Sequence, residues 1–139
     1  MSHILFFTGQ YTPALASNND DKIFVFGDNS CDYGIGGQAI IRGFPNALGV
    51  PTKWAPNDRP SSFYTELCFD STLIEARLDA IGRKLASGFI VVIPGTYDRI
   101  ELGTGLAELP TRAPAVYQTI CEQIRLIADH FGVTTDPLS

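Results

Sequence analysis

A run of five apolar residues, 89–93, lies between two amphipathic segments and constrains the fold more than any other feature of this sequence. Four of the five residues are β-branched, which is typical of a strand that is buried on both faces of a sheet. The flanking segments, residues 73–87 and 115–131, place apolar side chains at intervals of three and four, which predicts helices. A buried strand between two helices favours an α/β fold.

Shorter runs rich in Ile, Phe and Val predict two further strands at residues 4–7 and 23–27, and residues 47–51 are a candidate for another. We expect a loop at residues 12–21 and a short helix-compatible segment at residues 38–42. The sequence therefore predicts an α/β fold in which helices flank a mixed, partly parallel sheet.

Local signals mark the ends of the two long helices. Thr72, followed three residues later by Glu75, predicts a capping box at the start of the first, and Gly88 is placed to end it. Pro114 suits the first turn of the second helix, and Gly132 is placed to end it.

Length and composition exclude several classes of protein. Two halves of about 70 residues would each be near the lower limit for an independent core, so we expect one domain, residues 1–139. Ten basic against fifteen acidic residues give a net charge of −5 without a basic run, so no nucleic-acid partner is expected. The longest apolar run is too short to cross a membrane. Three scattered cysteines and the lack of a signal-peptide pattern predict a cytoplasmic protein.

Two glycine-rich segments follow predicted strands. The first contains Gly-Ile-Gly-Gly at residues 34–37, and the second reads Gly-Thr-Gly-Leu-Ala at residues 103–107. Loops at the carboxyl ends of strands are the usual ligand sites of α/β sheets, and glycines let backbone N–H groups approach an anion. Turn glycines explain a single such loop equally well, whereas two on one edge indicate a site for two phosphates or one diphosphate. Neither loop has the dinucleotide-fold or P-loop spacing.

The candidate binding residues are those of the two loops and the polar or aromatic side chains near them. Asp28 and Asn29 can bond a ribose or a base, or can form an Asx turn. Tyr97 either stacks on a base or packs its loop down, and Lys53 and Arg99 either complement phosphate or are solvated. The predicted set is Gly27, Asp28, Asn29, Gly34, Ile35, Gly36, Gly37, Gln38, Asn46, Lys53, Tyr97, Arg99, Gly103, Thr104, Gly105 and Leu106.

No catalytic residue is predicted, because the sequence contains no known nucleophile motif or metal-ligand spacing. We expect neither a metal nor a cofactor. If the protein is an enzyme, Asp28 is the candidate for activating water.

Four segments occur together in a specific order: Phe-Gly-Asp-Asn at 26–29, Gly-Ile-Gly-Gly-Gln-Ala at 34–39, Pro-Asn-Ala-Leu-Gly-Val-Pro-Thr-Lys at 45–53, and the glycine segment at 103–107. This order resembles a family of small, largely bacteriophage-encoded proteins that is similar to macro domains. The resemblance implies a macro-domain-like fold that binds an ADP-ribose-like ligand. It also implies that the two glycine segments are diphosphate loops and that Asp28 and Asn29 lie near the adenine and the distal ribose.

The resemblance further suggests what such binding achieves. A phage-encoded protein that holds an ADP-ribose derivative without turnover suits an anti-defence sponge, which sequesters a TIR-produced signal of Thoeris immunity in the host cytoplasm. The alternatives are an enzyme that removes ADP-ribose or its terminal phosphate, and a structural or peptide-binding protein. A homo-oligomer would suit a sponge, but the sequence gives no interface signal, and which derivative binds stays open.

Overall fold

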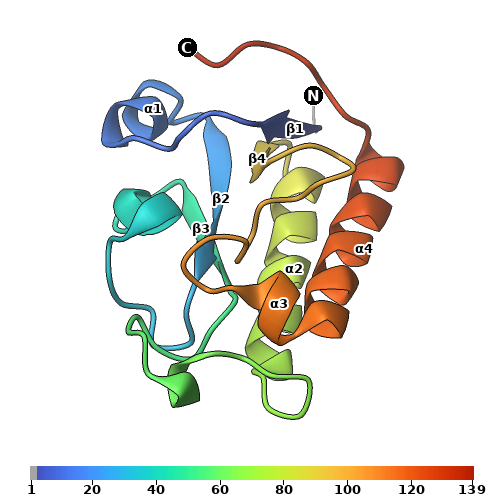
Figure 1. Ribbon diagram of the computed structural model, residues 1–139. Coiled ribbons are helices and arrows are strands. Elements are labelled where there is room, and N and C mark those ends of the chain that lie inside the picture. The colour runs from blue at the N-terminus through green and yellow to red at the C-terminus, as the bar shows by residue number, and fades with distance from the viewer. Residues whose placement is uncertain (1–2) are drawn as a thin grey trace.

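The computed structural model describes residues 3–139, which form one four-stranded sheet (Figure 1). The strands are β1 (Ile4–Phe7), β2 (Lys22–Asp28), β3 (Ala47–Pro51) and β4 (Ile90–Pro94), in the order β1-β4-β2-β3. All three pairings between these strands are parallel, so the predicted α/β class is confirmed, and the sheet is more uniformly parallel than expected.

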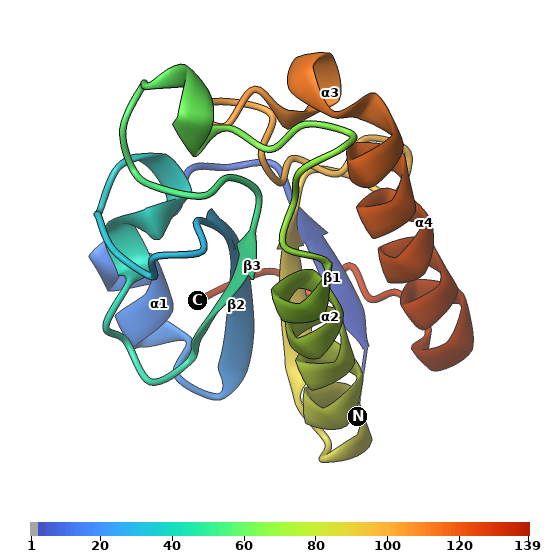
Figure 2. The ribbon, with the colours of Figure 1, turned by 90° about the horizontal axis from the view of Figure 1, so that it is seen from below.

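Helices cover both faces of the sheet, as Figure 2 shows. Helices α2 (Ser71–Ala86) and α4 (Pro114–Phe131) lie against one face, and α1 (Pro13–Asn18) and the 3₁₀ helix η1 (Gly37–Ile41) lie on the other.

Side chains of β2 alternate between the two cores. Ile23 and Val25 pack in the core with α2 and α4, whereas Phe24 and Phe26 pack in the core with α1 and η1. This double burial explains the nearly continuous apolar runs, because each face of an inner parallel strand needs its own apolar residues.

The two long helices confirm the periodicity argument. The predicted stripe on α2 is buried, and it consists of Ile74, Leu78, Ile81 and Leu85. The predicted capping box is wrong, however, because α2 begins one residue before Thr72. Asp70 caps it instead: its Oδ1 accepts a hydrogen bond of 3.2 Å from the N–H of Leu73. Gly88 and Gly132 have φ values of 100° and 95°, as expected of glycines that end helices.

The sequence pattern predicts the short helix η1, which lies where residues 38–42 were expected to be helix-compatible, but it does not predict the other short helical segments within residues 3–139. Residues 12–21 are not a simple loop, because α1 forms there with Thr12 as its cap and Pro13 in its first turn. Helix α3 (Leu109–Arg112) and the 3₁₀ helix η2 (Pro60–Ser62) are also single turns. Helices of this length are too short to display a 3.6-residue periodicity. None of the helices within residues 3–139 combines the length and apolar character that spanning a membrane requires.

Candidate functional site

The two glycine segments lie together at the carboxyl edge of the sheet. β2 and β4 are parallel neighbours, so the loops that follow them leave from the same edge. A cavity of about 470 Å³ lies between these loops. The predicted binding residues that line it are Gly27, Asp28, Asn29, Gly34, Ile35, Gly36, Gly37, Gln38, Lys53, Gly103, Thr104, Gly105 and Leu106.

Both loops have unused backbone donors. Within residues 3–139, the N–H groups of residues 34–37 and 103–107 donate to no other residue. The loops also touch: a Cβ atom placed on Gly36 would lie 3.2 Å from Cδ1 of Leu106. Two rows of unpaired N–H groups across a small cavity are suited to an anion with several oxygen atoms.

Gly27 and Gln38 fix the positions of the two loops relative to each other. A Cβ atom on Gly27 would lie 3.2 Å from the backbone nitrogen of Gly103, so this position requires a glycine or a shift of its neighbours. The Oε1 atom of Gln38 accepts from the N–H of Gly27 at 2.9 Å, and its Nε2 atom donates to the carbonyl of Glu101 at 2.6 Å. Gln38 lines the cavity, but its amide joins the ends of β2 and of the β4 loop, which is a structural role.

Asp28 and Asn29 are also bound within the protein. Asp28 forms an ion pair with Arg42, and only 2% of its side chain is exposed. Asn29 accepts from the N–H of Cys31 through Oδ1 at 3.0 Å and donates to the carbonyl of Tyr33 through Nδ2 at 2.7 Å. The Asx-turn alternative therefore describes Asn29. The ion pair of Asp28 was not foreseen, although a carboxylate at the buried end of a strand signals the need for a nearby cation.

Lys53 is the basic residue that lines the cavity. Its Nζ atom donates to the carbonyls of Asn57 at 3.0 Å and Leu106 at 3.5 Å, and lies 4.3 Å from the centre of the Phe63 ring. Among residues 3–139 it pairs with no carboxylate. Burial lowers the pKa of its ammonium. Its charge is therefore incompletely compensated, and it faces the second loop.

Three predicted residues lie outside the cavity. Asn46 is at the amino end of β3. Its buried amide donates to the carbonyls of Ala16 and Asn19, so it joins β3 to the end of α1. Tyr97 donates to Asp129 on α4 at 2.9 Å. Arg99 is exposed in the turn after β4. These three residues do not line the cavity between the loops, because closeness in sequence to a glycine loop does not fix the direction in which the chain turns.

A larger groove of about 890 Å³ runs between α2 and α4, away from the glycine loops. Its floor consists of side chains that the two helices already bury against the core, including Ile74, Leu78, Val116 and Ile120. It contains no converging row of free donors, so its size alone does not make it the better site. Residues 3–139 contain no cluster of three or more His, Cys, Asp or Glu side chains that could hold a metal ion.

Comparisons with other proteins bear on family rather than on function. No curated protein and no solved structure matches the chain. The model of a family described as "Family of unknown function (DUF7831)" matches residues 6–123, which is most of the chain. The chain therefore belongs to this family.

Proposed function

We propose that the protein binds an ADP-ribose-derived nucleotide, with the diphosphate held between the two glycine loops, and that it sequesters this ligand rather than transforming it. The observation that carries the proposal is the pair of opposed loops whose N–H groups, at residues 34–37 and 103–107, have no partner within residues 3–139. A diphosphate offers oxygen atoms in two directions and can accept from both loops at once.

The size of the site supports a small-molecule ligand. Small-molecule sites commonly enclose roughly 300–1,000 Å³, and the cavity of about 470 Å³ falls within that range. Lys53 contributes one positive charge beside the second loop, but Asp28, Asp58 and Glu101 also line the cavity. Attraction for a diphosphate would therefore come from the N–H groups of the two loops rather than from the charge of the lining side chains.

The state of Asp28 supports binding without turnover. A general base needs a lone pair within reach of the proton that it removes. Both carboxylate oxygens of Asp28 accept from Arg42, and Oδ1 also accepts from the N–H of Asn29 at 2.7 Å. With its side chain only 2% exposed, Asp28 is poorly placed to activate water. We therefore favour sequestration over the hydrolase or phosphatase alternative.

The most specific form of the proposal names the ligand class. A binder that releases its ligand unchanged suits a sponge for a TIR-produced ADP-ribose derivative, as in Thoeris immunity. The basis is the resemblance described above, and the geometry of the loops is compatible with it.

Calorimetry with ADP-ribose tests the proposal, with adenosine as a control that lacks phosphate. We expect heat with ADP-ribose and none with adenosine. The protein is then heated, and the released nucleotide is analysed by mass spectrometry. Recovery of intact ADP-ribose supports sequestration, whereas recovery of a cleaved product supports the hydrolase alternative. No heat with ADP-ribose or with TIR-derived nucleotides favours the structural or peptide-binding alternative.

A matched pair of variants tests the role of the backbone. Leu106→Pro removes one of the unpaired N–H groups, and Leu106→Ala keeps that N–H while removing a side chain that is 67% exposed. We expect the proline variant to bind ADP-ribose about tenfold more weakly than the alanine variant, as for the loss of a hydrogen bond to a charged group. Equal affinities, in variants with matching circular dichroism spectra, would contradict a site built from backbone donors.

A further inference from the structure

We propose that Arg42 is the positioning residue of the first glycine loop. It binds the carbonyl side of the loop peptides and thereby orients their N–H groups toward the ligand. Arg42 does not line the cavity. The proposal rests on the function proposed above and names the residue that orders the first glycine loop.

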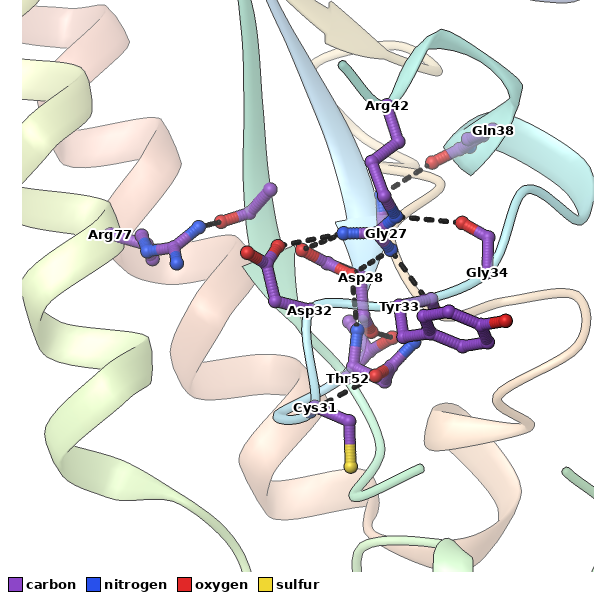
Figure 3. A network of polar contacts seen from close by, with 12 residues as sticks. Gly27, Asp28, Cys31, Asp32, Tyr33, Gly34, Gln38, Arg42, Thr52 and Arg77 are labelled. Carbon is purple, nitrogen blue, oxygen red and sulfur yellow. Dashed lines mark hydrogen bonds and ion pairs between the residues drawn. The ribbon is translucent and has the colours of Figure 1, made fainter. Parts of the chain in front are cut away.

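The guanidinium of Arg42 lies at the centre of the loop (Figure 3). Its Nε atom donates to the carbonyl of Gly34 at 2.7 Å. One terminal nitrogen donates to Asp28 at 3.2 Å and to Asp32 at 2.7 Å, and the other donates to Asp28 and to the carbonyl of Tyr33 at 3.4 Å. These five bonds match the five N–H donors of an arginine, so no donor remains for a ligand.

The surroundings fix the guanidinium in place. The Arg42 side chain is 17% exposed, and its guanidinium carbon lies 5.4 Å from the centre of the Phe26 ring. Asp28 occupies space over β3 that Gly49 leaves open by having no side chain. A buried ion pair of this kind is costly to break on one side, because the remaining charge stays desolvated. Arg42 is therefore held rigidly, and it fixes the loop through the carbonyls of Tyr33 and Gly34.

Because the peptide group is planar, the bonds from Arg42 to the loop carbonyls also fix the direction of the adjacent N–H groups. In a planar trans peptide, the carbonyl of one residue and the N–H of the next point in opposite directions. Since the carbonyls of Tyr33 and Gly34 point toward Arg42, the N–H groups of Gly34 and Ile35 point away from it. Gly34 and Ile35 line the cavity and Arg42 does not, which is consistent with N–H groups that face the cavity.

The loop needs this support because its backbone is unfavourable at Asp32, which has a φ of 55° in the left-handed region. Gly34 also has a positive φ, of 99°, which a glycine adopts without strain. A non-glycine residue persists in that region only where its surroundings hold it. The ion pair of Asp32 with Arg42 supplies such a hold.

Arg42 also polarises the peptides whose carbonyls it binds. A cation that binds a carbonyl polarises the peptide, and hydrogen bonds in such a chain strengthen one another. Asp28 and Asp32 offset the charge of Arg42, so the effect is confined to the dipoles of the two peptides that it binds. Arg42 therefore orders and polarises the loop peptides rather than placing a net positive charge near the ligand.

The test compares Arg42→Lys with Arg77→Lys in the full chain. Lysine keeps the charge at position 42 but cannot make the five-donor fork. Arg77 is a matched control, because it also donates to a backbone carbonyl, that of Gly49 at 2.9 Å, and does not line the cavity. Two readouts are measured: the affinity for ADP-ribose by calorimetry, and the ¹H–¹⁵N heteronuclear NOE of residues 33–37 in the ligand-free protein.

We expect Arg42→Lys to weaken ADP-ribose binding by about tenfold or more, as for the loss of charge-assisted bonds, and Arg77→Lys to leave it within about twofold. The NOE of residues 33–37 should fall only in Arg42→Lys. Unchanged affinity together with unchanged NOE values overturns the proposal. If the wild-type protein binds neither ADP-ribose nor TIR-derived nucleotides, the proposed function fails, while the NOE comparison still decides whether Arg42 orders the loop. If Arg42→Lys does not fold, Asp32→Ala replaces it, since that side chain is 68% exposed and its removal takes away one acceptor of Arg42; the same two readouts then apply.

Discussion

Replacing Gly103 by alanine should destabilise the protein strongly. Gly103 begins the second loop with a φ of 74°, in the left-handed region. A Cβ atom there would lie 2.7 Å from Cβ and 2.9 Å from Cγ2 of Thr52, and 3.0 Å from Cβ of Leu109. These neighbours are near the backbone and cannot swing aside as the end of a long side chain can.

Two costs add in this variant. A residue with a Cβ atom in the left-handed region costs about 1–2 kcal/mol. Inserting a methyl group into a packed site costs about 1–3 kcal/mol more. The free energy of unfolding should therefore fall by about 2–5 kcal/mol, a large part of the roughly 5–15 kcal/mol that stabilises a typical domain. The melting temperature should fall by about 4–20 °C, at about 2–4 °C for each kcal/mol.

Urea unfolding followed by circular dichroism measures this loss, with Gly105→Ala as the control. A Cβ atom on Gly105 would meet nothing within 4 Å, although it lies only two residues away in the same loop. We expect Gly105→Ala to change the free energy of unfolding by about 0.5 kcal/mol or less. If the two variants unfold at the same urea concentration, the close packing of the second loop against Thr52 is refuted.

Three further predictions concern the same edge of the sheet and its core. Gln38→Leu leaves the N–H of Gly27 and the carbonyl of Glu101 without partners, so it should lower the free energy of unfolding by about 2–4 kcal/mol in urea titrations; a loss under about 1 kcal/mol would mean that the bridge is dispensable. Burial raises the pKa of Tyr64 to about 12, so the folded state holds its proton more tightly than the unfolded state. Stability should therefore fall as pH rises from about 10 to about 12, by up to about 1.4 kcal/mol per pH unit for this group, and Tyr64→Phe should flatten the fall; urea midpoints at pH 9 and pH 11 measure it, and parallel curves would contradict it. Lys53→Met should weaken ADP-ribose binding by about tenfold and make it less sensitive to salt, which calorimetry at two salt concentrations checks; unchanged affinity would exclude the ammonium from the site.

The features that sequence predicts well are those encoded by neighbouring residues. The apolar run at residues 89–93 and the stripes of α2 and α4 identify their own structure, because each repeats with the period of the element that it forms. The two loops are found for a related reason, since glycines after an apolar run mark the end of a strand. Strand order is different: that β4 lies between β1 and β2 depends on contacts between distant segments, which no local pattern records.

The roles of the polar residues near the site were harder to predict than their positions. Gln38 and Asn29 line the cavity as expected, yet their side chains bond to the protein itself. Arg42 lies in sequence beyond the glycine segment, but it turns back to Asp28, fourteen residues earlier. A polar residue beside a loop can serve the loop or the ligand, and only the direction of its side chain distinguishes the two.

The contact between Gly27 and Gly103 links stability to binding. These residues are far apart in sequence, yet a Cβ atom on the first would lie 3.2 Å from the backbone nitrogen of the second. The two loops can approach this closely only because both positions lack side chains, and that approach creates the cavity. A ligand held by N–H groups of both loops would bridge the ends of β2 and β4 and would bind only the folded chain. Such a ligand stabilises the fold by mass action, in proportion to the logarithm of its concentration relative to its Kd. The close approach of the two loops therefore has two consequences: substitutions here lower the stability of the fold, and a bound ligand raises it.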